Sequence, residues 1–167
     1  MQSTSFVSQE WLRPETPGQY HGYFQEDFGR WPRRFSRRWL KTDRYPAALF
    51  HLLPEIPRGG RVLDVGCGTG RTLRVLRRER PDLALFGTDL AAVERLEGEF
   101  VRQLAHEGRF YQADLLDERH PLPRQSFDLA YSSNTIEHVP DGVAFVRAMA
   151  DVVRPGGYVL VHTMNHR

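Results

Sequence analysis

From residue 61 onward, short apolar runs alternate with longer stretches of helical periodicity. Such alternation is typical of βαβ units, in which a helix crosses over between two parallel strands. The pattern therefore predicts an α/β fold built on a doubly wound parallel sheet. The expected strands are residues 61–65, 84–88, 110–112, 127–132 and 158–163.

Helices are predicted between these strands from apolar residues spaced three and four positions apart. They occupy the segment that ends at Pro81, residues 91–106 and residues 142–153. The last helix is expected to bury one apolar face, made of Val143, Val146, Met149, Val152 and Val153. Residues 154–157 read Arg-Pro-Gly-Gly, a composition that predicts a turn before the last strand.

The composition changes near residue 59, which we expect to be a domain boundary. Residues 1–58 are rich in aromatic, basic and proline residues and are expected to form a helical cap, whereas residues 59–167 form the core. Within the cap, aromatic residues recur every four positions over residues 31–40, which predicts an amphipathic helix with basic faces. A short helix over residues 47–53 is expected to lead into the first strand.

Composition excludes several classes of protein. The single cysteine, Cys67, forbids an intramolecular disulfide and a cysteine-cluster zinc site, which indicates a reducing compartment. No apolar run approaches the roughly 18 residues that span a bilayer, so a soluble cytoplasmic protein is expected. With 23 basic and 21 acidic residues, the net charge of +2 creates no field that requires nucleic acid or an anionic membrane as partner.

The strongest local signal is the glycine-rich turn after the first expected strand, Asp64-Val65-Gly66-Cys67-Gly68-Thr69-Gly70. Such a turn before a helix lets a ligand approach bare backbone and reach free N–H groups. A dinucleotide-binding turn has the spacing Gly-x-Gly-x-x-Gly, whereas here the third glycine arrives one residue early and Arg71 follows it. The spacing therefore disfavours a dinucleotide, and a purely structural tight turn stays open.

The turn resembles the motif acidic-x-Gly-x-Gly-x-Gly of class I S-adenosylmethionine-dependent methyltransferases. Residues 127–140, ending in Glu-His-Val-Pro, are similar to the fourth-strand segment of the small-molecule, methyltransferase type 11-like branch. Residues 153–157, Val-Arg-Pro-Gly-Gly, are similar to its Leu-Arg-Pro-Gly-Gly run. The resemblance covers roughly residues 60–163 and implies a Rossmann-like sheet of strand order 3-2-1-4-5.

The resemblance implies S-adenosylmethionine as cofactor and a set of binding residues. The glycines would accommodate its methionine portion, Asp89 would accept both ribose hydroxyls, and Asp114 would accept the adenine amino group. From the residues alone, Asp89 also fits an N-cap of the following helix, and Asp114 fits a turn or cap. The expected cofactor contacts are Asp64, Gly66, Cys67, Gly68, Gly70, Asp89, Leu90, Asp114, Leu115 and Asn134.

His138 is the candidate catalytic residue. Methyl transfer in this class is an in-line displacement, so proximity and alignment do most of the work. A base assists when the acceptor is a hydroxyl or an acidic carbon, and the ordinary histidine pKa of about 6.5 suits that role. The alternative is a histidine that only packs there. Glu137 fits a metal ligand or a structural carboxylate, but its segment supplies too few ligands for a metal site.

Two motifs that this sequence lacks restrict the class of methyl acceptor. Methylation of adenine and exocyclic amines uses Asn/Asp-Pro-Pro-aromatic after the fourth strand, where this chain has Ser-Asn-Thr-Ile. Cytosine C5 methylation needs a nucleophilic cysteine there, whereas Cys67 lies in the glycine-rich turn. We therefore expect a small-molecule acceptor rather than nucleic acid, with O-methylation preferred over N- or C-methylation. The basic residues of 31–44 favour a solvated helix face; alternatively they form a patch for an anionic acceptor, an anionic lipid or RNA.

The core of this family normally continues beyond the fifth strand through a helix and an antiparallel hairpin, whereas only residues 164–167 follow here. Either the polypeptide is truncated, or a partner chain covers the edge. The fifth strand is therefore expected to be an apolar edge, and a homodimer paired through it is predicted. Two other functions stay open. One is an inactive, cofactor-binding partner subunit. The other is an NAD-dependent oxidoreductase, which the glycine spacing and the lack of a Tyr-x-x-x-Lys pair disfavour.

Overall fold

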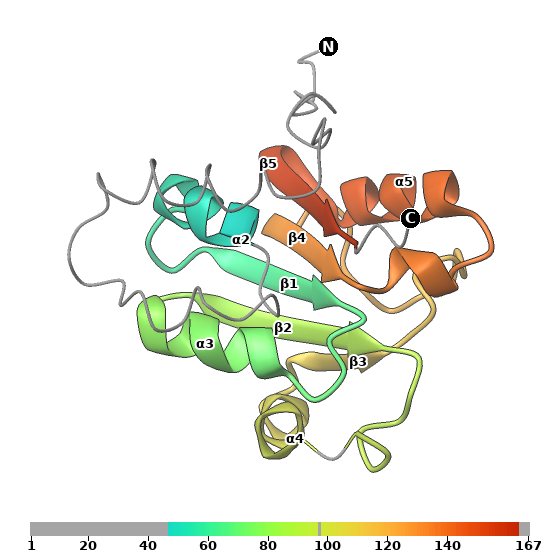
Figure 1. The fold of residues 1–167 in the computed structure, drawn as a ribbon, viewed down its shortest axis with the longest axis horizontal. Helices are drawn as coiled ribbons and strands as arrows, with labels where there is room; N and C mark the ends of the chain where they lie inside the picture. The colour runs from blue at the N-terminus through green and yellow to red at the C-terminus, as the bar shows by residue number, and fades with distance from the viewer. Residues whose placement is uncertain (1–46, 97, 164–167) are drawn as a thin grey trace, which may run out of the picture. The chain divides into compact units, whose positions relative to one another are not determined.

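The computed structural model describes residues 47–96 and 98–163, which form a parallel sheet of order β3-β2-β1-β4-β5 (Figure 1). The strands are β1 Arg61–Val65, β2 Ala84–Asp89, β3 Phe110–Gln112, β4 Phe127–Ser133 and β5 Val153–His162. Every neighbouring pair is parallel, so the carboxyl ends of all strands lie at one edge. The predicted Rossmann-like sheet and its order are confirmed. The helix expected over residues 31–40 lies outside the described residues.

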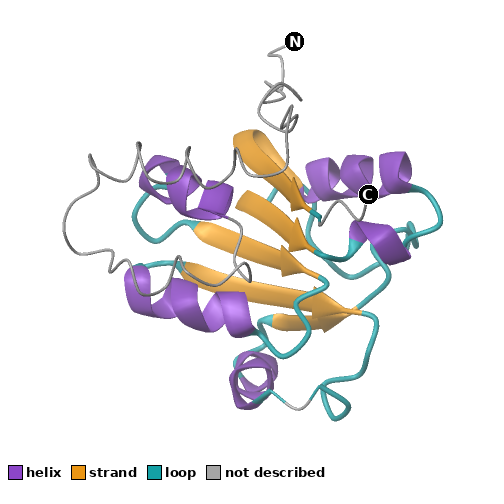
Figure 2. Ribbon diagram, in the orientation of Figure 1, coloured by secondary structure: helices purple, strands orange, loops and turns teal. Residues whose placement is uncertain are grey.

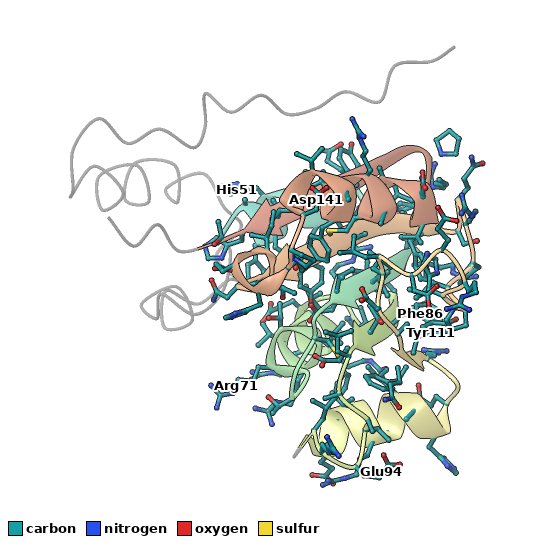
Figure 3. The ribbon with its side chains drawn as sticks, turned by 90° about the vertical axis from the view of Figure 1, so that its right-hand side faces the viewer. His51, Arg71, Phe86, Glu94, Tyr111 and Asp141 are labelled. Atoms are coloured by element: carbon teal, nitrogen blue, oxygen red, sulfur yellow. The ribbon has the colours of Figure 1, made fainter. Side chains whose placement is uncertain are left out.

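Helices lie on both faces of this sheet (Figure 2). They are α2 Ala47–Leu52, α3 Arg71–Glu79, α4 Glu99–His106 and α5 Gly142–Val152, with short 3-10 helices η3 Leu53–Glu55 and η4 Ile136–His138. A Cβ at Gly87 would lie 3.4 Å from Leu73 of α3, whereas Phe86, the preceding residue of β2, belongs to the apolar core that includes Phe145 and Met149 of α5. Because successive residues of a strand face opposite sides, α3 and α5 cover opposite faces. Figure 3 views the carboxyl edge, with Arg71 of α3 and Phe86 labelled on either side.

The face under α5 holds an aromatic core. Phe86 of β2 and Phe127 of β4 meet edge to face, with ring centroids 5.3 Å apart and planes at 75°. The Arg61 guanidinium stacks over both rings, with its Cζ 4.8 Å and 5.2 Å from their centroids. Edge-to-face aromatic pairs and cation–π contacts each contribute on the order of 1 kcal/mol beyond area burial. These contacts tie the beginning of β1 to both of its neighbours.

Helix α4 is shorter than the helix predicted over residues 91–106. It begins at Glu99, after Gly98, whose extended backbone has a φ of −109°. A Cβ at Gly98 would collide with the backbone of Thr69 in the glycine-rich turn. The chain therefore passes this turn in an extended conformation, and the helix starts only afterwards. The apolar periodicity upstream falls instead on a turned segment whose Leu96 is buried.

Helix α5 occupies the predicted residues up to Val152 but buries a different face. Its buried side chains are Phe145, Met149 and Val152, whereas Val143 is 64% exposed. The Asp141 carboxylate accepts hydrogen bonds from the backbone N–H groups of Val143 and Ala144, at 2.9 and 3.0 Å. This cap places Val143 in the exposed first turn, so its predicted burial is wrong.

Strand β5 begins at Val153, earlier than predicted. The expected helix ended at this residue, and residues 154–157 were expected to form a separate turn. They form a bulge instead, because Phe127 pairs with Val153 and Leu129 with Tyr158. Gly156 permits the bulge with a φ of +78°. β5 lies at one end of the strand order, and a homodimer paired along it stays a prediction.

A buried carboxylate joins three strands at the amino edge of the sheet. Asp128 of β4 accepts the backbone N–H of Arg61 at 2.7 Å through Oδ2 and the Nε–H of Arg154 at 2.7 Å through Oδ1. Its side chain is 11% exposed, whereas that of Arg154 is 45% exposed. The interaction therefore combines a shielded backbone hydrogen bond with a partly screened ion pair, and it links β1, β4 and β5.

Replacement of Asp128 by alanine should lower the free energy of unfolding by about 2 kcal/mol, because the Arg61 N–H would lose its acceptor. Asp128→Asn keeps a carbonyl acceptor and should lose about half as much. Urea denaturation measures both. Asp151, whose ion pair with Arg124 is exposed, supplies the control, and Asp151→Ala should lose less than about 0.5 kcal/mol. Equal losses in the two alanine variants would contradict the assignment.

Candidate functional site

Three chain segments that are distant in sequence lie at the carboxyl edge of the sheet, the edge that faces the viewer in Figure 3. The glycine-rich turn 66–70 follows β1, Asp89 ends β2, and η4 follows β4. In doubly wound sheets, ligands bind outside the carboxyl ends of the strands, where such segments converge. The topology therefore brings the glycine-rich turn, Asp89 and η4 to one edge of the sheet.

The glycine-rich turn is fixed on one side and open on the other. Gly66 has a φ of +74°, and a Cβ there would collide with the side chain of Thr135. The N–H groups of Gly66 and Cys67 both donate to the carbonyl of Thr88, at 2.9 and 3.0 Å. Gly68 has a φ of +50°, and a Cβ there would enter open space. A ligand can therefore approach the backbone at Gly68.

The Asp89 carboxylate joins this turn to the end of β2. Its Oδ2 accepts the Gly68 N–H at 2.9 Å, and its Oδ1 accepts the Ala91 N–H at 2.9 Å. Asp89 is partly exposed, and each oxygen retains further lone pairs for a ligand. The alternative role as N-cap of the following helix is wrong, since Gly98 occupies that position in α4.

Asp64 lies inside the sheet below the turn. It is 3% exposed, and its Oδ2 accepts the hydroxyl of fully buried Tyr131 at 2.6 Å. The two residues stand opposite each other in the pairing of β1 with β4. Burial raises the pKa of Asp64 to about 7; the Tyr131 hydrogen bond opposes this shift, and the nearby Asp89 charge adds to it. The pKa of Tyr131 is also raised, chiefly by burial.

The remaining predicted cofactor contacts differ in exposure. Leu90 is 69% exposed beside Asp89, and Asp114 and Asn134 are exposed at the ends of β3 and β4. Cys67 is buried, which raises the pKa of its thiol. Leu115 belongs to the apolar core under α5. The exposed side chains are thus available to a ligand, whereas Cys67 and Leu115 support the loops from below.

A second polar group occupies the ends of β4 and β5. Ser133 Oγ lies 3.2 Å from His162 Nδ1, and Thr163 donates a hydrogen bond to Glu137. His138, the predicted base, is exposed in η4. Sequence reasoning missed Tyr131, Ser133 and His162 as site residues. Their only signal in the sequence was a polar group near the end of an expected strand.

Comparison with known proteins shows the family to which the chain belongs. A family model described as a methyltransferase domain matches residues 36–167. The chain belongs to the S-adenosylmethionine-dependent methyltransferase family. The resemblance in the sequence motifs is thereby confirmed.

Two relatives of this methyltransferase domain are O-methyltransferases by name. The tocopherol O-methyltransferase of Arabidopsis thaliana is 35% identical over 117 residues, which cover 64% of this chain and 31% of that protein. The ubiquinone biosynthesis O-methyltransferase of Xylella fastidiosa is 36% identical over 124 residues, which cover 72% of this chain and 48% of that protein. The chain therefore spans about a third to a half of these curated relatives.

Solved methyltransferase structures share the fold. A Haemonchus contortus phosphoethanolamine N-methyltransferase, crystallised with phosphomonomethylethanolamine and S-adenosylhomocysteine, aligns with a TM-score of 0.56 and 26% identity over 69% of this chain and 26% of that chain. A methyltransferase from Mesorhizobium loti aligns with a TM-score of 0.50 and 31% identity over 69% of this chain and 50% of that chain. In the described part of this methyltransferase domain, no helix has the length and apolarity needed to cross a bilayer.

The buried Asp64 carboxyl should make the stability of this domain depend on pH. Its pKa is about 7 in the folded chain against an ordinary 3.8, so the folded state binds more protons between these values. Stability should therefore fall as pH rises from about 4 to about 7, by up to about 4 kcal/mol, and level off above that range. Asp64→Asn keeps an acceptor for Tyr131 but cannot titrate.

Unfolding free energies of the wild type and Asp64→Asn, measured by denaturant at several pH values, test this expectation. The stability of the variant relative to the wild type should increase across the same pH range. Parallel pH curves for the two proteins would show that Asp64 has an ordinary pKa.

Proposed function

We propose that this domain binds S-adenosylmethionine at the carboxyl edge of the sheet and directs methyl transfer to a hydroxyl group of a small molecule. The observation that carries the proposal is the hydrogen bond from the Gly68 N–H to the Asp89 carboxylate. This bond holds the glycine-rich turn, which is open at Gly68, beside the partly exposed carboxylate of Asp89. When bound, the cofactor supplies an electrophilic methyl group on a sulfonium sulfur. The protein's contribution is then alignment and exclusion of water.

The residues at the edge fit an adenosyl ligand. The open space at Gly68 admits the methionine portion close to the backbone. Asp89 has lone pairs left for two ribose hydroxyls after its bonds to Gly68 and Ala91. Leu90, which is 69% exposed in the described structure, offers an apolar surface for the adenine ring. Exposed Asp114 offers a hydrogen-bond acceptor for the adenine amino group. The same proposal assigns the other predicted cofactor contacts to the binding site: Asp64, Gly66, Cys67, Gly70, Leu115 and Asn134.

A hydroxyl acceptor is favoured by the named activities of the two O-methyltransferase relatives. His138 remains the base that the sequence predicts, and it lies at the same edge. An N-methyltransferase is the second candidate, because a phosphoethanolamine N-methyltransferase shares the fold at 26% identity. Transfer of a labelled methyl group to phenol, catechol, ethanolamine and their phosphorylated forms distinguishes these acceptors and tests whether an anion is preferred. An inactive partner subunit would bind cofactor and label none of them.

Calorimetry with S-adenosylhomocysteine and NAD tests the cofactor. We expect S-adenosylhomocysteine to bind and NAD not to bind. The reason is that the glycine spacing differs from the Gly-x-Gly-x-x-Gly pattern that binds a pyrophosphate. Tighter binding of NAD would overturn the proposed function and favour the oxidoreductase alternative.

Asp89→Asn tests the ribose contact in the same experiment. The amide has one acceptor oxygen in place of two, so the affinity for S-adenosylhomocysteine should fall about ten- to hundredfold. Asp151→Asn, an exposed change on α5, should leave affinity unchanged. If Asp89→Asn folds normally and binds within threefold of the wild type, Asp89 is only a backbone clamp.

A further inference from the structure

An imidazole and a hydroxyl face each other where β4 and β5 end. Ser133 and His162 are register partners in this strand pair, and Ser133 Oγ lies 3.2 Å from His162 Nδ1. The next residue reinforces the contact, since the Asn134 N–H donates to the His162 carbonyl at 2.9 Å. Both the backbone and the ring of His162 are therefore held by β4, and the position of Nε2 is fixed with them.

The surroundings keep His162 uncharged near neutral pH. Burial lowers the pKa of the imidazole, and the Glu137 carboxylate of η4 acts in the opposite direction. Ser133, the contact from β4, carries no charge, and among the described residues Glu137 is the charged group that acts on His162. Glu137 is itself held by a hydrogen bond from Thr163, the residue after β5. A neutral imidazole with one nitrogen engaged has the other available to accept a proton.

This group is continuous with the glycine-rich turn. Thr135 fills the space beside Gly66, and its hydroxyl lies 3.4 Å from the carbonyl of Val65. Ser132 also donates to that carbonyl, at 2.9 Å. The end of β4 therefore contacts the glycine-rich turn on one side and His162 on the other. Neighbouring strands lie about 4.8 Å apart, so the imidazole is about two strand spacings from the end of β1, on the side away from Asp89.

We propose that His162 is the general base that takes the proton of a hydroxyl acceptor, with Ser133 as the positioning residue that holds its ring. The inference rests on the proposed function. In the balanced step, the acceptor oxygen forms its bond to the methyl carbon while the carbon–sulfur bond breaks and sulfur keeps the electron pair. The hydroxyl proton passes to His162 Nε2, and the imidazolium later releases it to water.

The arrangement differs from that of a serine hydrolase. In a Ser-His-Asp triad the serine faces Nε2, and the carboxylate orients Nδ1. Here Ser133 faces Nδ1, so it can accept the Nδ1–H and leave Nε2 as the basic nitrogen. The geometry therefore favours Ser133 as an orienting group and not as a nucleophile.

His162 also differs from His138 in its support. The side chain of His138 is exposed and makes no hydrogen bond to any described residue, so nothing in this part of the chain orients its ring. A general base must lie within hydrogen-bond reach of the proton it removes, and an oriented ring meets that requirement at lower entropic cost. The two histidines are thus rival bases that substitution can separate.

Long-range proton–nitrogen NMR of the chain tests the orientation without turnover. At neutral pH we expect the His162 ring to be neutral, with its proton on Nδ1. The ring signals of His162 are assigned as those that disappear in the His162→Gln variant. Ser133→Ala should abolish this tautomer preference, and His106→Gln, an exposed change on α4, should not. An Nε2–H tautomer in the wild type would overturn the proposal.

Methyl transfer to catechol provides the catalytic readout. His162→Gln should lower kcat about 100-fold or more, with the affinity for S-adenosylhomocysteine within threefold of the wild type. Ser133→Ala should lower kcat about fivefold, equivalent to one ordinary hydrogen bond. His106→Gln should match the wild type.

A loss of kcat confined to His138→Gln would overturn the assignment of His162 in favour of His138. If the wild type does not methylate catechol, the proposal is tested by the His162 tautomer measured by NMR. A wild-type chain that fails to bind S-adenosylhomocysteine would instead contradict the proposed function, so the two failures are distinguishable.

Discussion

One side chain, Asp89, connects the segments that follow β1 and β2 at the carboxyl edge of the sheet. Its carboxylate holds the N–H of Gly68 and that of Ala91, so the turn after β1 and the loop after β2 take their positions from the same group. The carbonyl of Thr88 holds the start of the turn as well. The site is therefore positioned by the pairing of β1 with β2 at the centre of the sheet, where opening is most costly.

The strands and the glycine-rich turn could be predicted because each depends on a local pattern, and the strand order came from resemblance to a family. The start of α4 could not be predicted, since the extended backbone of Gly98 results from its close approach to Thr69. Periodicity alone marked Val143 as buried, whereas the Asp141 cap places it in an exposed first turn. These errors arise where a contact with another segment or a cap overrides an amphipathic pattern.

The candidate site shows the same division. The motif residues Gly68 and Asp89 lie together at the edge as the family resemblance implies. Tyr131 and His162 escaped prediction because their partners are set by strand register, which a sequence pattern does not contain. His138 attracted attention by standing in a Glu-His-Val-Pro segment, yet its side chain is exposed in η4.

Strand β4 links the buried Asp64–Tyr131 pair to the Ser133–His162 pair through its alternation. Tyr131 bonds Asp64 of β1, and two residues later Ser133 contacts His162 of β5 on the same face. A slip of one residue would turn Tyr131 into the apolar core around Phe127, where its hydroxyl would lose its partner at a cost of about 1–3 kcal/mol. The core and the polar pairs therefore select one register, and that register sets the distance between the glycine-rich turn and the His162 imidazole.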